Sequence, residues 1–287
     1  MRVLVTGASG QLGAYLLREF RGRADLVAWS GSRRGDLLGV PLLPVELADP
    51  AAITAAFRAA RPDVVIHCAA LARIADCHRA PDRARRVNVA ATAALAGECA
   101  RSGARLVFVS TDLVFDGERG GNREDDPPVP LSVYGRTKRD AEDAARAAPR
   151  ATVARLSLLY GPSLNGRASF FDEQTAALRQ RRNVTLFTDE WRTPLDLATA
   201  ARALAALAES DVKGLWHVGG PERLSRYEMG VRLAAALGAD ASVIVAATRD
   251  AVPAPEPRPR DTSLDSSRWR AVFPGIPWPQ YPAAVAP

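Results

Sequence analysis

The amino-acid sequence predicts an α/β protein, in which a doubly wound parallel sheet is followed by a smaller C-terminal α/β lobe. Short, nearly all-apolar runs alternate with helical patterns through the first half of the 287 residues. That alternation is typical of a parallel sheet covered on both faces. A glycine-rich turn follows the first apolar run and opens a helical pattern, as at the first crossover of a doubly wound sheet.

The first half is expected to form one domain, residues 1–157. Apolar runs predict strands at 3–5, 26–29, 44–47, 64–67, 106–109 and 151–156. Periodic apolar positions predict helices at 11–21, 50–60, 83–101 and around Lys138.

The second half, residues 158–287, is expected to form a closely packed substrate-binding lobe, with some segments returning to the first sheet. Its helical patterns are 170–181, 197–209 and 225–237, and its strand patterns are 184–186 and 215–218. Proline-rich stretches follow at 253–259 and 274–287, and the second is expected to wrap the surface. No internal repeat or flexible linker separates the two halves.

Composition argues against several protein classes. No run approaches 18 uninterrupted apolar residues, so no membrane span is expected. The chain opens directly on a strand pattern, so no signal peptide is expected. Three cysteines without metal-ligand spacing suit a reducing compartment, and we expect a cytoplasmic protein.

The net charge of +6 does not predict nucleic-acid binding, because basic and acidic residues are interleaved. Anionic small ligands account for the excess equally well. Of the 38 basic residues, only Lys138 and Lys213 are lysines, so a lysine here is a rare choice. The oligomeric state is not fixed by the sequence, and a homodimer is one alternative.

The glycine-rich turn predicts a phosphate-binding loop of the Rossmann type. Gly7 permits a sharp turn, Gly10 lets the backbone approach a pyrophosphate, and Gly13 allows tight packing of helix on strand. Free N–H groups at the start of the helix favour an anion. The expected cofactor contacts are Gly7, Ser9, Gly10, Gln11, Leu12 and Gly13; a turn with only a packing role is the alternative.

The end of the second strand favours NADP(H) over NAD(H). A carboxylate there would bind the ribose 2′-hydroxyl of NAD, but the segment instead carries Arg33 and Arg34. A guanidinium suits a 2′-phosphate in charge and geometry. Solvated loop charges are the alternative.

Tyr134 and Lys138 are the expected acid/base pair. Residues four apart share a helix face, and a nearby ammonium should lower the phenol pKa from its usual value near 10. Tyr134 would then exchange a proton with a carbonyl oxygen. A solvated tyrosine and lysine on a helix face is the alternative.

A hydroxyl is expected at the end of the fifth strand, where ligands bind in such sheets. Thr111 would hold the substrate carbonyl oxygen, with Ser110 as the alternate. An ordinary strand-end turn is the competing interpretation.

These motifs resemble the extended short-chain dehydrogenase/reductases, and within them the dTDP-4-dehydrorhamnose reductase group. The matching motifs are Gly-Ala-Ser-Gly-Gln-Leu-Gly at 7–13, Ser-Thr-Asp-Leu-Val-Phe-Asp-Gly at 110–117 and Tyr-Gly-Arg-Thr-Lys at 134–138, with Arg155 and Leu-Tyr-Gly at 159–161. The resemblance covers most of the first 165 residues and is loose beyond them.

The resemblance implies a Ser/Thr-Tyr-Lys triad formed by Thr111, Tyr134 and Lys138, with substrate bound between the lobes. Asn88 would support the active-site lysine through water. The cofactor pocket would further include Glu46, Leu47, Cys68, Ala69 and Ala70.

The sequence also departs from this group. Leu113 stands where the group often has tyrosine, and it also makes 4,6-dehydration unlikely, because dehydratases carry a Thr-Asp-Glu run there. The stretch 188–196 differs from that of the reductases. Asp112, Trp191 and Arg192 are the expected substrate contacts, and lobe packing is an equal alternative for the last two.

The remaining polar residues carry weaker signals. The three histidines are scattered, so no metal site is expected. Cys77-His78 lacks an oxyanion turn and is not expected to be a nucleophile pair. Arg258 or Arg260 would approach the substrate phosphates, with surface charge as the alternative.

The predicted function is NADP(H)-dependent reduction of a keto group on a nucleotide-linked sugar. An NAD-dependent nucleotide-sugar epimerase and a non-catalytic, cofactor-binding regulatory subunit are the alternatives. The sequence does not identify the sugar or the nucleotide.

Overall fold

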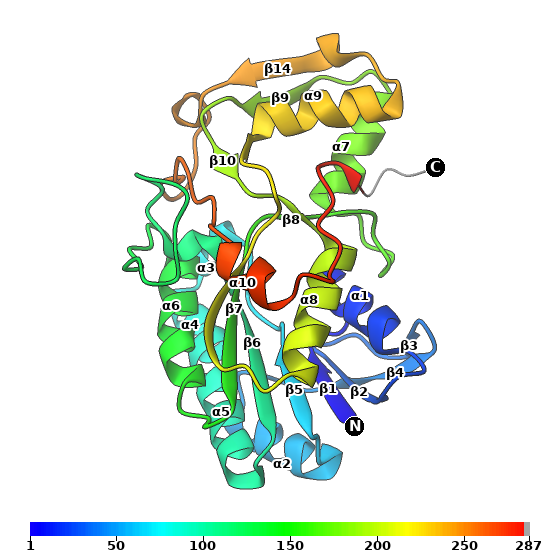
Figure 1. Ribbon diagram of the computed structural model, residues 1–287, viewed down its shortest axis with the longest axis vertical. Coiled ribbons are helices and arrows are strands. Elements are labelled where there is room, and N and C mark those ends of the chain that lie inside the picture. The colour runs from blue at the N-terminus through cyan, green and yellow to red at the C-terminus, as the bar shows by residue number, and fades with distance from the viewer. Residues whose placement is uncertain (284–287) are drawn as a thin grey trace.

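A computed structural model describes residues 1–283 and shows one large sheet with a smaller lobe beyond its strand ends (Figure 1). The last four residues of the stretch 274–287 lie outside the described part. The strand order is β12-β7-β6-β5-β1-β2-β4-β3. Every pairing is parallel except that between β3 and β4, so the predicted fold class is confirmed.

The strands of the large sheet are short and mostly buried. Their bounds are β1 (Arg2–Thr6), β2 (Asp25–Ser30), β3 (Asp36–Leu37), β4 (Val40–Pro44), β5 (Val64–His67), β6 (Arg105–Thr111), β7 (Ala151–Leu156) and β12 (Gly214–Val218). The helices that accompany the sheet are α1 (Gln11–Phe20), α2 (Pro50–Ala60), α3 (Ile74–Arg79), α4 (Pro81–Arg85), α5 (Ala91–Ser102), α6 (Val133–Ala145), α8 (Leu197–Glu209) and α10 (Ser267–Val272).

Two apolar cores lie on opposite faces of this sheet. Leu16 of α1, Leu204 of α8 and Trp269 of α10 pack on one face. Phe57 of α2 and Leu95 of α5 pack on the other, together with α6. Alternate residues of each strand therefore face different helix layers, which is why the strands are apolar throughout.

The smaller lobe has its own core around Tyr160, Phe171 and Leu233. Its elements are β8 (Leu159–Tyr160), α7 (Phe170–Arg179), β9 (Val184–Phe187), β10 (Trp191–Arg192), β11 (Leu195–Asp196), β13 (Leu224–Ser225), α9 (Arg226–Leu237) and β14 (Ile244–Ala247). Three elements from the second half of the chain lie in the larger unit, because β12 pairs with β7 and both α8 and α10 pack on a face of the large sheet.

The predicted third strand was placed too late in the chain. It was expected at 44–47, but β4 ends at Pro44. Val45 still donates to Ser30 O, and the Glu46 carboxylate then accepts from the Ala48 N–H (2.9 Å), which turns the chain away from the sheet. Residues 46 and 47 therefore lie beyond the strand end.

The predicted helix 83–101 is interrupted. A π-helical turn, η1 (Arg86–Ala90), separates α4 from α5. Such turns often occur at functional sites, and this one carries Asn88.

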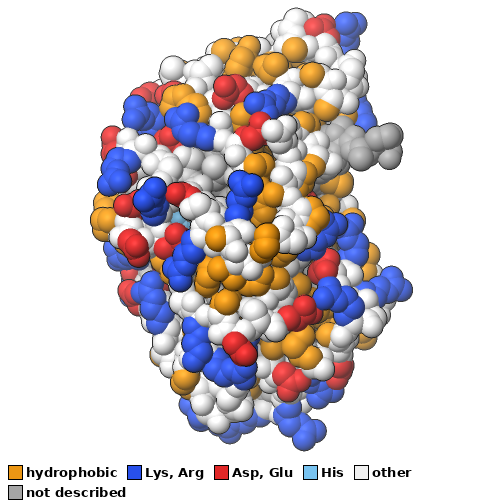
Figure 2. Space-filling model, in the orientation of Figure 1, with side chains coloured by type: hydrophobic (Ala, Val, Ile, Leu, Met, Phe, Trp, Pro, Cys, Tyr) orange, Lys and Arg blue, Asp and Glu red, His pale blue; other side chains and the backbone are white. Residues whose placement is uncertain are grey.

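Within residues 1–283, no helix combines the length and the apolar character needed to cross a membrane. On the face shown in Figure 2, basic and acidic side chains are interspersed.

Candidate active site

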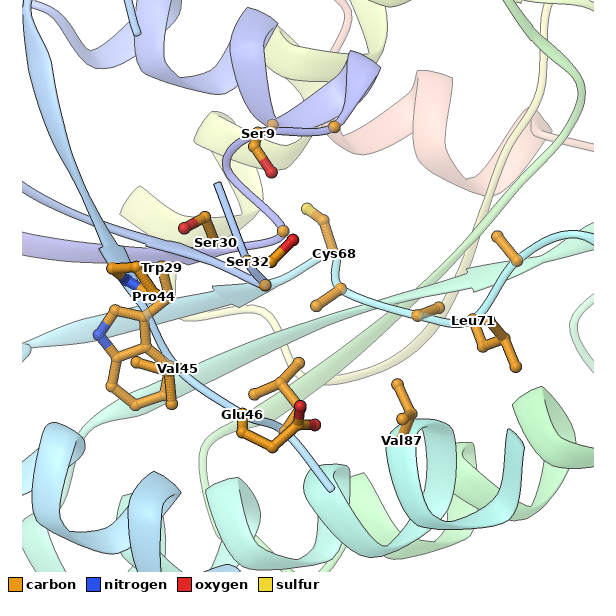
Figure 3. Close-up of a pocket in the computed structure, with 18 of the residues that line it drawn as sticks. Ser9, Trp29, Ser30, Ser32, Pro44, Val45, Glu46, Cys68, Leu71 and Val87 are labelled. Atoms are coloured by element: carbon orange, nitrogen blue, oxygen red, sulfur yellow. The ribbon is translucent and has the colours of Figure 1, made fainter. Parts of the chain in front are cut away.

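A cavity of about 840 Å³ lies at the carboxyl ends of β1, β2 and β5 (Figure 3). The glycine turn forms one side of it, and the segments after β2, β4 and β5 form the others. Its predicted lining residues are Gly7, Ser9, Gly10, Gln11, Leu12, Gly13, Arg34, Glu46, Leu47, Cys68, Ala69 and Ala70. Its unpredicted ones are Trp29, Ser30, Gly31, Ser32, Pro44, Val45, Leu71, Ala72, Arg83 and Val87.

Two glycines of the turn have no room for a side chain. Gly7 has φ +67°, and a Cβ there would lie 2.8 Å from Ala69 N. A Cβ on Gly13 would lie 2.3 Å from Gly7 O. The N-cap residue Gly10 offers no side-chain acceptor to the first N–H groups of α1, so these donors are available to an anion in the cavity.

The two arginines after β2 do not share one role. Arg34 lines the cavity. Arg33 is not among the lining residues, and its guanidinium donates to Asn165 O (2.8 Å). Asn165 in turn donates to Ser9 O (2.9 Å), so Arg33 and Asn165 tie the second half of the chain to the glycine turn. Arg83 of α4 adds a cation to the cavity that the sequence analysis did not single out.

The far side of the cavity from Ser9 holds Val45, Glu46 and, on η1, Val87 (Figure 3). Trp29 forms the adjoining wall and is 1% exposed. Apolar surfaces with one carboxylate suit a planar base bearing an amino group.

Asn88 is buried beside this cavity rather than in its lining. Its amide bonds both backbone groups of Leu71, at 2.8 and 3.1 Å, and donates to Thr137 Oγ1 (2.9 Å). It therefore joins the loop after β5 to α6, whereas the family resemblance implied support of the lysine through water.

Tyr134 and Lys138 both lie on α6, whose start is capped by Ser132 through the Gly135 N–H (3.1 Å). Lys138 is 2% exposed, donates to Val109 O (2.7 Å) and lies 4.0 Å from the Phe108 ring centroid. Burial lowers the pKa of Lys138 to about 8, against the opposing effect of Glu142.

The expected lowering of the Tyr134 pKa is wrong for this structure. Burial and the Asp112 carboxylate raise the pKa of Tyr134 above its usual value, and a hydrogen bond with Thr111 opposes them only in part. The Lys138 ammonium is directed at Val109 O, and desolvation of the phenol dominates.

Thr111, and not Ser110, is hydrogen-bonded to the Tyr134 hydroxyl. Ser110 donates to Glu142 Oε1 (2.5 Å) and points into the protein between β6 and α6. Thr111 Oγ1 donates to Asp112 Oδ1 (3.1 Å) and accepts from Leu113 N. The structure thus brings Thr111 and Tyr134 together, as predicted from their positions in the sequence.

Asp112 is a buried junction between the two halves of the chain. Its Oδ2 accepts from Ser157 (3.1 Å) and Thr262 (3.0 Å) and lies 3.7 Å from Arg192 Nε. Burial raises the pKa of Asp112, and Arg192 and these hydroxyls oppose the rise.

The expected substrate contacts in the second lobe are engaged with protein groups. Arg192 is 5% exposed and pairs with Glu190 (3.2 Å). The Arg223 guanidinium stacks on Trp191, 4.7 Å from the ring centroid. Arg258 caps carbonyls of residues 249, 252 and 253 and lies over Phe187. These contacts favour the packing alternative for Trp191 and Arg192, and they show Arg258 bound to backbone carbonyls, a role that differs from both interpretations of its sequence position.

The residues with weaker sequence signals have structural partners. His67 is buried between Thr6 and Thr92, and the Cys77 thiol donates to Leu71 O (3.1 Å). Burial raises the pKa of Cys77 to about 11. Arg260 donates to Glu118 O (3.0 Å).

Comparison with known proteins gives consistent matches along the chain. The family described as RmlD substrate binding domain matches residues 1–286. The probable low-salt glycan biosynthesis reductase Agl14 of Haloferax volcanii is 31% identical over 271 residues, covering 93% of this chain and 90% of that protein. The methionine adenosyltransferase 2 subunit beta of Pongo abelii is 35% identical over 279 residues, covering 93% and 81%.

Solved structures share the fold. A dTDP-4-dehydrorhamnose reductase from Bacillus anthracis in complex with NADP superimposes with a TM-score of 0.84 at 22% identity, covering 94% of this chain and 92% of that one. Other structures of this fold hold NAD. The chain therefore belongs to the RmlD substrate binding domain family, and its structural neighbours are oxidoreductases of the extended short-chain dehydrogenase/reductase type.

Proposed function

We propose that this protein is an NADP(H)-dependent reductase that acts on a keto group of a nucleotide-linked sugar. The observation that supports it best is the position of Tyr134 and Thr111. Thr111 ends β6 and Tyr134 lies in the first turn of α6, at the carboxyl edge of the sheet where the glycine turn and Arg34 line a cavity large enough for a dinucleotide. Thr111, Tyr134 and the predicted cofactor contact Lys138 are not among the residues that line this cavity.

The residues of this cavity fit the dinucleotide. Because Gly7 and Gly13 carry no side chain, the backbone of the turn is open to a bound ligand, and the first N–H groups of α1 are not capped by a side chain. These groups would hold the pyrophosphate. Lys138 would bind the nicotinamide ribose, and bound NADPH would supply the hydride.

The protonation state of the Tyr134 phenol suits it to the role of proton donor in a reduction. Because burial raises the pKa of Tyr134, the hydroxyl stays protonated at neutral pH. A protonated phenol donates to the carbonyl oxygen as the carbon is reduced, while Thr111 orients that oxygen. The phenolate left behind is stabilised by the cation of Lys138.

NADPH is favoured over NADH because a single exposed cation, Arg34, extends into the cavity near the end of β2. The same fold in the Bacillus anthracis reductase holds NADP. The segment after β2 has no carboxylate for a 2′-hydroxyl.

A turnover assay tests the proposal directly. Oxidation of NADPH is followed with keto-sugars linked to dTDP, UDP and GDP, and Tyr134→Phe should lower kcat by at least about a hundredfold. Full activity of this variant would exclude the assigned role. Tightly held NAD⁺ released on denaturation would instead favour an epimerase.

A second candidate is a cofactor-binding subunit of a larger enzyme. It is favoured by the relatives named methionine adenosyltransferase 2 subunit beta. Purification with a partner enzyme, and no turnover of any keto-sugar nucleotide, would support it. For either candidate function we propose a cytoplasmic location, because three free cysteines suit a reducing environment.

A further inference from the structure

Glu142 continues the helix face that carries Tyr134 and Lys138, one further turn along α6. It is 1% exposed. Its Oε1 accepts from Ser110 Oγ (2.5 Å) and from Arg155 Nε (2.9 Å), and its Oε2 accepts from Arg155 Nη2 (2.7 Å). One carboxylate thus fixes α6 against β6 and β7.

The hydrogen bond between Glu142 and Ser110 influences Lys138 and Thr111 through the backbone of β6. Ser110 lies between Val109, whose carbonyl accepts from Lys138, and Thr111, which bonds to the phenol. A side chain that holds Ser110 in place therefore fixes the acceptor of the lysine and the position of the threonine together.

More positive than negative charge is buried around Glu142. Lys138 and Arg155 are cations, and both are at most 2% exposed. His217 adds no charge, because burial lowers its pKa to about 3; its Nδ1 donates to Asn122 O and its Nε2 accepts from Arg155. Arg146, at 3.9 Å from Glu142, is half exposed. His67 and Cys68, which face Lys138 from the end of β5, carry no charge at neutral pH, because burial lowers the pKa of His67 to about 3 and raises the pKa of the Cys68 thiol to about 12. Glu142 is therefore the buried anion that offsets two buried cations.

We propose that Glu142 is a positioning residue that keeps Lys138 protonated at the pH of turnover and holds β6 against the catalytic helix. The proposal rests on the proposed function, in which the cation of Lys138 binds ribose and stabilises the phenolate. Glu142 acts through Lys138 and Ser110 and does not touch the reacting atoms.

The sign of each perturbation follows from charge. Lys138 loses its proton as the pH rises through about 8. Removal of the Glu142 charge takes away the carboxylate that raises the lysine pKa, so that pKa falls further and activity should be lost at lower pH. Removal of Arg155 leaves the negative charge of Glu142 without its cationic partner. The carboxylate then stabilises the Lys138 ammonium more strongly and raises the lysine pKa, so activity should persist to higher pH.

The experiment compares pH profiles of kcat for the wild type and for the variants Glu142→Gln, Arg155→Met and Glu142→Gln/Arg155→Met. We expect the basic limb to move down by about one pH unit in the first and up by a similar amount in the second. In the double variant it should return toward the wild-type position. Glu98→Gln is the matched control, because Glu98 is a 3%-exposed carboxylate paired with Arg101 and is not among the groups that shift the Lys138 pKa.

A purely structural role gives a different result. Such a role would lower kcat in the single variants without moving the basic limb of the pH profile, or would move that limb in the same direction in both variants. Either outcome overturns the proposal. Loss of one partner of a buried ion pair is destabilising. If Glu142→Gln does not fold, the opposed shift in Arg155→Met and its reversal in the double variant decide the question.

Binding of NADPH gives a readout that does not depend on turnover. The dissociation constant is measured against pH by fluorescence of the reduced nicotinamide. The variants should shift the pH at which affinity falls, in the same directions as above. If the wild type binds NADPH but reduces no keto-sugar nucleotide, the proposed function fails while this measurement still tests Glu142; an unshifted affinity profile in all variants overturns the role of Glu142.

Discussion

Exchange of Arg34 for glutamine is expected to weaken binding of NADPH and to leave binding of NADH unchanged. Arg34 lines the cavity beyond β2, and its side chain is exposed. An exposed charge pair contributes up to about 1 kcal/mol. A bidentate contact with a phosphate of nearly two charges raises this to about 1–2 kcal/mol, which corresponds to about a five- to thirtyfold increase in the KM for NADPH.

The neighbouring arginine supplies a matched control. Arg33→Gln removes the same charge one residue away, but the Arg33 side chain is bound to Asn165 O and does not line the cavity. It should change the KM for NADPH less than Arg34→Gln does. Both constants are measured at fixed ionic strength, because added salt screens an exposed pair. An equal rise in KM for NADPH and NADH in Arg34→Gln, or a larger effect of Arg33→Gln, would refute the assignment of the 2′-phosphate to Arg34.

Three further outcomes are expected. Gly13→Ala should abolish binding of NADPH, measured by fluorescence titration, because the new Cβ would lie 2.3 Å from Gly7 O; in Gly97→Ala the nearest atom lies 3.6 Å away on a flexible arginine, so this control should bind normally. Asp112→Asn should lower the pKa of the Tyr134 phenol, which the carboxylate raises, so the phenolate absorbance that is lost in a Tyr134→Phe background should develop at lower pH; an unchanged absorbance titration would contradict this. His67 and His217 have pKa values lowered to about 3 by burial. The unfolded chain therefore binds more protons below pH 6.5, and the free energy of unfolding, measured with urea, should fall by on the order of 1 kcal/mol per histidine for each unit by which the pH is lowered from 6.5 toward 3.

Local sequence patterns sufficed to predict the sheet and the glycine turn. The strand at 3–5 is apolar on both faces because helices cover both, and the turn after it requires Gly7 and Gly13 at fixed positions. The error at β4 arose from the same patterns. Val45 continues the apolar run, but the Glu46 carboxylate closes a turn onto Ala48 N, which composition alone does not reveal.

The direction of a side chain could not be predicted where its partner lies far away in sequence. Arg33 and Arg34 are chemically identical neighbours, and only the contact of Arg33 with Asn165, 132 residues later, separates their roles. Arg83 and Val87 were missed because the π-turn η1 interrupts the regular helix period that places residues on one face.

Spacing identified the catalytic pair but not its electrostatics. A separation of four residues places Tyr134 and Lys138 on one helix face, whether that face is buried or exposed to water. Whether the pKa of the phenol falls or rises depends on burial and on Asp112, and burial is a tertiary property. The same burial places the pKa of Lys138 at about 8, near the pH at which its charge is needed.

Asp112 shows how the second lobe acts on the chemistry without contacting the reacting atoms. Its Oδ1 accepts from Thr111, while its Oδ2 is bound by Thr262, 150 residues later, and lies near Arg192 of the second lobe. A shift of that lobe changes the contacts of the same carboxylate that raises the pKa of Tyr134. Arg192, which sequence analysis assigned to the substrate, is thus better placed to transmit the position of the lobe to the phenol.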